Sequence, residues 1–196
     1  MRSNICKIEK GTKDLATILR ESEKVAVYNE LTHKQTLQLR LLCEEIDSML
    51  PEIIDDFEGD LWIEFEEGVC KVNVSIRFSE FTVEKKDELI RISKNKKNAA
   101  AVGITGKIRS AVENIFLDEE TIRVCATSSD AYYLGTGCSD YACLWSLEKY
   151  RNDTRQKENT ESWDELEKSV IASVADDVIV GVKGKQANIT IVKKFA

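Results

Sequence analysis

Apolar residues recur at helical spacing in the first quarter of the chain. From residue 12 to residue 29 they fall three or four positions apart, which predicts a helix capped by Thr12. A second helix begins after Thr32, which forms a capping-box pattern with Gln35. Pro51 marks a kink or the end of this helix, because proline cannot donate a backbone hydrogen bond. The apolar stripe of the second helix consists of Leu39, Leu42, Ile46, Met49, Leu50 and Ile53.

After the second helix, the spacing of apolar residues changes from helical to strictly alternating. Apolar residues occupy every second position from residue 61 to 66 and again from 70 to 78, with Glu67 and Gly68 between the two runs. This pattern predicts an antiparallel hairpin with one buried face and one face in water. A second hairpin is predicted over residues 178–191, with its turn at Lys183-Gly184-Lys185. The polar positions of the second run, expected to face water, are Lys71, Asn73, Ser75 and Arg77.

The segments between the two hairpins have mainly helical patterns. Helices are expected over residues 83–95, 98–117 and 141–151, and a polar loop is expected over residues 152–162. A last helix is expected to run from residue 162 or 163 to Asp176, directly before the second hairpin. The sequence therefore predicts an α+β fold. It would be a two-layer sandwich in which a mainly antiparallel or mixed sheet of about four or more strands carries helices on one face.

Length and charge narrow the classes of protein that the chain can represent. Its 196 residues suit a single domain over 1–196, with 1–31 as an N-terminal helical extension and 32–196 as the α/β core. The formal net charge of −7 argues against nucleic acid and anionic membranes as partners, since both attract basic surfaces. The N-terminus has no apolar signal core, and no apolar run approaches the roughly 18 residues of a membrane span. We therefore expect a cytoplasmic protein.

The six cysteines do not indicate a metal centre. They are scattered without a CxxC pair, and the chain has a single histidine. Cys43 lies in a helical apolar run and Cys70 on the apolar face of a strand, which is typical of small buried thiols. The sequence thus predicts structural cysteines and no metal ligands.

The order of the predicted elements resembles that of a known ATP-binding fold. A helix, a hairpin, further helices, a last helix and a final hairpin follow one another as in the ATPase domain of gyrase, Hsp90, histidine kinases and MutL (the GHKL fold) and of anti-sigma-factor kinases. Residues 39–49 resemble the first helix of that fold, and residues 61–78 and 163–195 occupy the places of its two hairpin units. The segments LRLL, GKIR and WDELEKS are also similar to segments of bacterial proteins without an assigned function.

The resemblance implies roles for four residues of the second helix. Glu44 or Glu45 would be the carboxylate that activates water, and Ser48 or Asp47 would assist a magnesium ion bound with ATP. The sequence departs from the family at the position of the magnesium-binding asparagine. One turn after the two glutamates it has Ser48 and Met49. Consecutive acids are also typical of the solvated face of an amphipathic helix, which is the alternative interpretation.

Other motifs of the family are missing as well. The strand that ends near residue 78 is not followed by the Asp-x-Gly-x-Gly that would hold adenine, and no glycine-rich loop precedes the helix at residue 163. A second candidate for phosphate contact is the segment from Asn98 to Lys107, because glycine allows a close approach of backbone amides and lysine neutralises charge. Its two glycines, Gly103 and Gly106, also suit close helix packing.

These observations favour a non-catalytic or weakly nucleotide-binding regulatory or interaction protein on a degenerate ATPase fold. It would act through a protein partner, and a homodimer is one candidate assembly. One alternative is an ATP-binding serine kinase of the anti-sigma type with altered motifs, which would use ATP and magnesium. The other is an unrelated small-molecule-binding protein that uses the glycines of 98–107 and 135–140. If the chain is an enzyme, the expected activity is that of an ATP-dependent kinase or ATPase.

Overall fold

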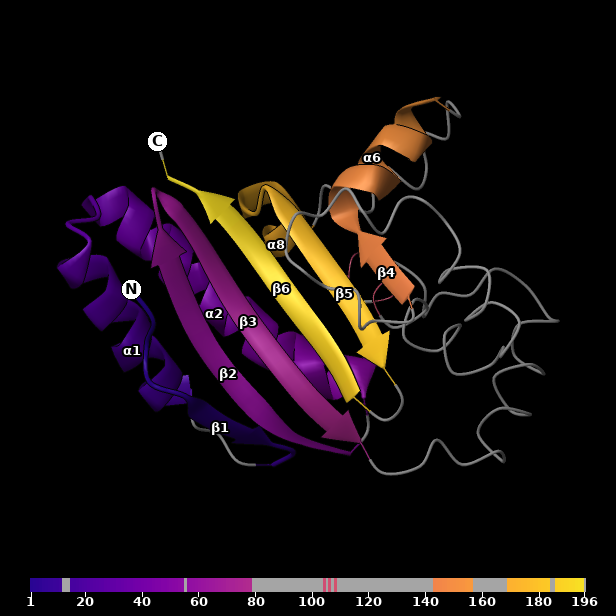
Figure 1. Cartoon of the computed structure of the whole chain (residues 1–196), viewed down its shortest axis with the longest axis horizontal. Coiled ribbons are helices and arrows are strands. Elements are labelled where there is room, and N and C mark those ends of the chain that lie inside the picture. The colour runs from indigo at the N-terminus through magenta and orange to yellow at the C-terminus, as the bar shows by residue number, and fades with distance from the viewer. Residues whose placement is uncertain are drawn as a thin grey trace, which may run out of the picture.

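A computed structural model describes residues 1–11, 15–54, 56–78, 104, 106, 108, 143–156, 169–183 and 186–195 of the chain. These residues form an α+β fold with one open antiparallel sheet of six strands in the order β1-β2-β3-β6-β5-β4, together with four helices (Figure 1). The elements in chain order are β1 (Cys6–Glu9), α1 (Leu15–Tyr28), α2 (His33–Ile53), β2 (Phe57–Glu66), β3 (Val69–Phe78), β4 (Cys143–Ser146), α6 (Leu147–Gln156), α8 (Val170–Val174), β5 (Asp177–Lys183) and β6 (Gln186–Lys194).

The longest helix, α2, forms as its sequence predicts. The Thr32 side chain accepts the backbone N–H of Gln35, and the Gln35 side chain accepts the backbone N–H of Thr32, so the capping box is complete. The predicted apolar stripe is buried along its whole length. Pro51 lies inside the last turn, and the helix ends two residues later at Ile53.

Both predicted hairpins are present and meet at the centre of the sheet. β2 and β3 pair from Phe57↔Phe78 to Glu66↔Val69, so that Glu67 and Gly68 form the two-residue turn. The φ angles of Glu67 and Gly68 are both positive, 49° and 78°, which matches the right-handed twist of the two strands that this two-residue turn connects. β5 pairs with β6, and β6 pairs with β3 in antiparallel register. The last hairpin of the chain therefore lies beside the first.

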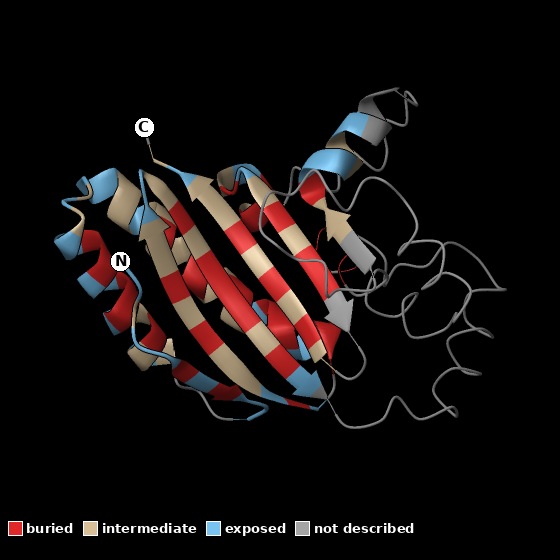
Figure 2. Cartoon of the chain, viewed as in Figure 1, coloured by how far each residue is buried: buried red, intermediate tan, exposed pale blue. Residues whose placement is uncertain are grey.

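One face of the sheet is the core and is covered by helices. Burial alternates along the strands (Figure 2), and the buried apolar residues of β2, β3, β5 and β6 form one hydrophobic core with those of α2. Helices α1, α2 and α8 lie on this face, and α6 extends from β4 at the edge of the sheet (Figure 1). Within the described ranges, no helix has both the length and the apolar character that a membrane span needs. Residues 1–31 contribute β1 at one sheet edge and α1 beside α2.

The polar face of β3 differs from the prediction at one residue. Arg77 is exposed, but Asn73, which was expected to face water, is only 9% exposed. Asn73 lies in the middle of the sheet with Trp62 and Thr190 as its cross-strand neighbours. Thr190 Oγ1 donates to Asn73 Oδ1 at 3.0 Å, and Asn73 Nδ2 donates to the carbonyl of Lys71 at 3.3 Å. Its polar atoms are therefore satisfied by neighbours on the sheet.

Three boundaries in the second half of the chain were predicted wrongly. Within the expected helix over 141–151, residues 143–146 are a strand and the helix begins only at Leu147, because residues 143–146 pair with the edge of β5. The expected loop after residue 151 is helical up to Gln156. The last helix ends at Val174 instead of Asp176, since Ala175 and Asp176 already have extended or bent backbone. Strand β1 was not predicted, because four residues are too few to show a period.

Part of the predicted helix over 98–117 lies among the described residues. Residues 104, 106 and 108 are helical, and Ile104 and Ile108 are buried in the core as their spacing of one turn predicts. The expected helix over 83–95 and the cap at Thr12 lie outside the described residues.

Candidate functional site

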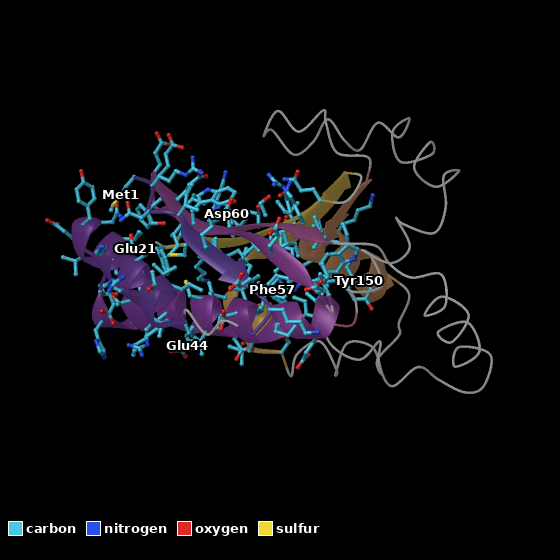
Figure 3. The ribbon with its side chains drawn as sticks, turned by 90° about the horizontal axis from the view of Figure 1, so that it is seen from below. Met1, Glu21, Glu44, Phe57, Asp60 and Tyr150 are labelled. Atoms are coloured by element: carbon cyan, nitrogen blue, oxygen red, sulfur yellow. The ribbon has the colours of Figure 1, made fainter. Side chains whose placement is uncertain are left out.

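The four candidate residues of α2 point in different directions. Consecutive residues of an α-helix are separated by about 100°, so the buried stripe fixes where the other side chains point. Glu44 and Ser48, one turn apart, lie on the side of α2 away from the sheet, where Figure 3 shows Glu44. Glu45 and Asp47 are half-buried on opposite flanks of the helix. The helix therefore does not gather the four polar side chains at one point.

Glu44 is the centre of an ion-pair network on the outer surface. Arg40 Nε lies 3.0 Å from Glu44 Oε1, and Arg40 Nη1 lies 3.2 Å from Glu23 Oε1 on α1. Arg40 thus connects two acids of neighbouring helices. All three side chains are more than a third exposed, so water and salt screen the network and its contribution to stability is small.

Ser48 stands where the resembled family has its magnesium-binding asparagine. Its hydroxyl donates to the carbonyl oxygen of Glu45 at 3.0 Å, a bond within its own helix, and its side chain is exposed. A serine hydroxyl that is bonded to the backbone of its own helix is a poorer cation ligand than an amide oxygen that extends from the helix.

The second candidate segment is described at one residue only. Gly106 is helical and buried between the core residues Ile104 and Ile108. Asn98, Gly103 and Lys107 lie outside the described residues. The structure thus provides no geometry for a phosphate contact in this segment.

A polar cluster that the sequence reasoning missed lies where α8 leads into β5. Asp177 Oδ1 accepts the backbone N–H of Glu148 at 3.0 Å and the Ser146 hydroxyl at 3.1 Å, so this carboxylate caps the start of α6. The carboxylate of Asp176 accepts the backbone N–H of Lys194 at 2.6 Å and lies 3.3 Å from the ammonium of Lys193. The sequence signal was the Asp-Asp pair directly before an alternating strand.

Arg151 on α6 completes this cluster from the other side. Its guanidinium donates to the carbonyl oxygens of Asp176 and Ala172, and Ala172 lies in α8. The last carbonyls of a helix have no partner within the helix, so a guanidinium is well placed to bind them. Asp177 and Arg151 together fix α6 to the corner between α8 and β5.

The same corner contains a hollow of about 310 Å³ that is open to solvent. Its lining residues are Glu148, Arg151, Asn152, Asp176, Asp177, Val192 and Lys194. The side chains of Asp176, Asp177 and Arg151 among them are already bonded to helix ends and strand backbone, so these three residues have a structural role. In the part of the chain that the structure describes, no three His, Cys, Asp or Glu side chains lie together as metal ligands would.

Comparison of the chain with protein families, curated protein sequences and solved structures finds no match.

Proposed function

We propose that this chain is a regulatory or interaction protein on a degenerate ATPase fold, and that it does not hydrolyse ATP. The observation that carries the proposal is the environment of Glu44. The residue that would act as base is held by Arg40 on the side of α2 away from the sheet, and its companion Ser48 is bonded to its own helix. A general base must reach the water that it activates, within about 3 Å.

The order of elements supports the ATPase-like part of the proposal. A long capped helix, α2, precedes the hairpin β2–β3, and a helix, α8, leads directly into the hairpin β5–β6. The two hairpins meet through β3 and β6, and α2 and α8 contact each other on the same face. This is the order in which the resembled family places its first helix, first hairpin, last helix and last hairpin.

A thermal-shift titration tests the proposal. The purified chain is titrated with ATP, ADP and a non-hydrolysable ATP analogue, each with and without magnesium. A ligand present at 100 times its Kd stabilises the folded state by about 2.7 kcal/mol. For a chain of this size, that corresponds to a rise in Tm of roughly 5–10 °C. We expect no magnesium-dependent rise up to roughly millimolar nucleotide, and no release of phosphate.

Three variants make the outcome specific. Ser48→Asn restores an amide one turn after Glu44, and we expect it to create no magnesium-dependent shift, because position 48 faces outward. Glu45→Gln removes the acid on the flank of α2, and Glu44→Gln is its matched control on the outer side. A magnesium-dependent shift in the unmodified chain that Glu45→Gln or Glu44→Gln abolishes would overturn the proposal in favour of the kinase alternative. A shift that is independent of magnesium and of both glutamates would indicate weak nucleotide binding without catalysis, which the proposal includes.

A further inference from the structure

Exposed apolar side chains are concentrated at one end of the described residues. The large apolar side chains that remain exposed are Met1, Ile5, Val27, Tyr28 and Leu37, all within the first 37 positions. Val27 and Tyr28, at the end of α1, are 79% and 72% exposed. Soluble proteins expose single apolar residues at random, whereas two adjacent exposed apolar side chains at the end of one helix indicate a contact surface.

The outer side of α1 has a regular pattern. Ala16, Arg20, Glu23 and Val27 follow one another at spacings of four, three and four residues, which is the spacing of a helix–helix contact. All four are exposed, and they lie opposite the buried residues Ile18 and Val25. We call these four residues the outer stripe of α1.

The outer stripe is complementary to itself. Its order along the helix is apolar, basic, acidic, apolar. When a second copy of α1 is laid against it in the antiparallel direction, Ala16 meets Val27 of the second copy and Arg20 meets Glu23 of the second copy. A two-fold axis repeats each contact, so the interface contains two apolar pairs and two ion pairs. The reverse, parallel arrangement would place Arg20 against Arg20 and Glu23 against Glu23.

Helix α2 fits the same arrangement. Helices α1 and α2 contact each other and are joined by residues 29–32 alone, so they run side by side in opposite directions. Val27 near the end of α1 and Leu37 near the start of α2 are both exposed apolar residues, at the end of the helix pair where the two helices connect.

We propose that the outer stripe of α1, with Leu37 and Arg40 of α2, is the interface of a homodimer. In this dimer the layer formed by α1 and α2 of one copy packs against the same layer of the other copy. The two-fold axis crosses α1 between Arg20 and Glu23. The occupant is a second copy because the charge pattern is palindromic, a property that only a symmetric contact uses.

Sedimentation equilibrium of the full chain is the first test. We expect a reversible monomer–dimer equilibrium with Kd in the range of roughly 1 to 100 micromolar, because the contact is small and partly ionic. Raising the salt concentration should weaken the dimer, since the ion pairs are exposed. A chain that remains monomeric up to roughly millimolar concentration overturns the proposal.

A charge swap identifies the surface. Arg20→Glu places acids on both sides of the axis, and Glu23→Arg places bases on both sides, so each variant alone should weaken dimerisation by at least about tenfold. In an equimolar mixture of the two variants every ionic contact joins opposite charges, and a heterodimer should form with an affinity close to that of the unmodified chain. The double variant Arg20→Glu/Glu23→Arg should dimerise by itself for the same reason.

Controls separate the interface from effects on folding. Arg77→Glu reverses an exposed charge on the open face of the sheet and should leave the dimer unchanged. Circular dichroism should show that the Tm of each variant stays within about 2 °C of the original, since the substituted side chains are exposed. Dimerisation that survives both single variants, or a mixture that fails to associate although both variants are folded, overturns the assignment.

Discussion

Glu21 on α1 is a buried acidic residue. It is only 4% exposed. Its carboxylate accepts a bond from the Lys24 ammonium at 2.5 Å and from the backbone N–H of Asn4 at 3.2 Å. The hydrogen bond from Lys24 holds the pKa of Glu21 below its usual range, against the opposing effect of burial. Glu21 therefore ties the segment before β1 to helix α1.

This lowered pKa makes part of the stability depend on pH. A carboxyl whose pKa is lowered by folding stabilises the native state above the unfolded pKa of about 4.3, and that stability is lost as pH falls through the native pKa. We expect Glu21→Gln to reduce the free energy of unfolding by about 1–2 kcal/mol at pH 7. The difference between variant and original should stay constant from pH 7 to about 5, and should shrink as pH falls below the unfolded pKa of about 4.3.

Urea denaturation at a series of pH values measures this difference. Glu30→Gln is the matched control, because Glu30 is exposed and follows the same helix, and its effect should stay within about 0.5 kcal/mol. A Glu21→Gln effect that is independent of pH would contradict a role for the charge.

The described cysteines behave as core residues. Cys6, Cys43 and Cys70 are buried, and none of them is in a disulfide. Burial raises the pKa of the Cys70 thiol to about 12 and raises that of Cys43 as well. Since the thiolate is the reactive form, we expect Cys43 and Cys70 to resist alkylation in the native protein at pH 8 and to react in urea. Peptide mapping by mass spectrometry assigns the label to each cysteine, and rapid native labelling of Cys43 would contradict its place in the core.

At the scale of elements, the pairing of β2 with β3 depends on Gly59. A methyl group built at Gly59 would meet the carbonyl oxygen of Ser75 and lie 2.8 Å from Ile76 Cγ2, atoms that are held in the strand opposite. Glycine is required here for the close approach of two backbones.

We expect Gly59→Ala to destabilise the fold by about 1–3 kcal/mol, because the added carbon forces the two strands apart. Glu66→Ala, an exposed change on the same strand, should alter stability by no more than about 0.5 kcal/mol. Chemical denaturation measures both. Equal stability of the two variants would mean that β2 shifts at no cost to accommodate the methyl group.

The elements that the sequence predicted correctly are those with several periods of pattern. The buried apolar residues of helix α2 run from Leu39 to Ile53, about four turns, and β3 alternates over four buried apolar positions. Strand β4 was mistaken for the start of a helix because its four residues fit either period, and its pairing with β5 decided between them. Of the candidate site, the sequence identified the polar residues of α2 but not their directions relative to α1 and the sheet.

At the scale of the whole molecule, the two proposals use opposite sides of the helix layer. A nucleotide site of the resembled type would lie between the helices and the sheet, whereas the proposed dimer uses the outer surface of α1 and α2. The two tests are therefore independent. A dimer without nucleotide binding would mean that the fold serves as a scaffold for association. Nucleotide binding without a dimer would favour the flank of α2 that carries Glu45 as the binding site.

The sequence by itself determined helices α1 and α2, the two hairpins and the faces that they bury, because hydrophobic periodicity is a property of neighbouring residues. Only the tertiary structure decided the contacts of individual polar groups. Asp177 caps helix α6 by binding a backbone N–H 29 residues earlier in the chain. Glu44 is held by an arginine that also binds α1, and Asn73 is buried on a face expected to be exposed to water. These outcomes depend on which distant segments pack together, and the energy of a polar group is set by the partner that it finds there.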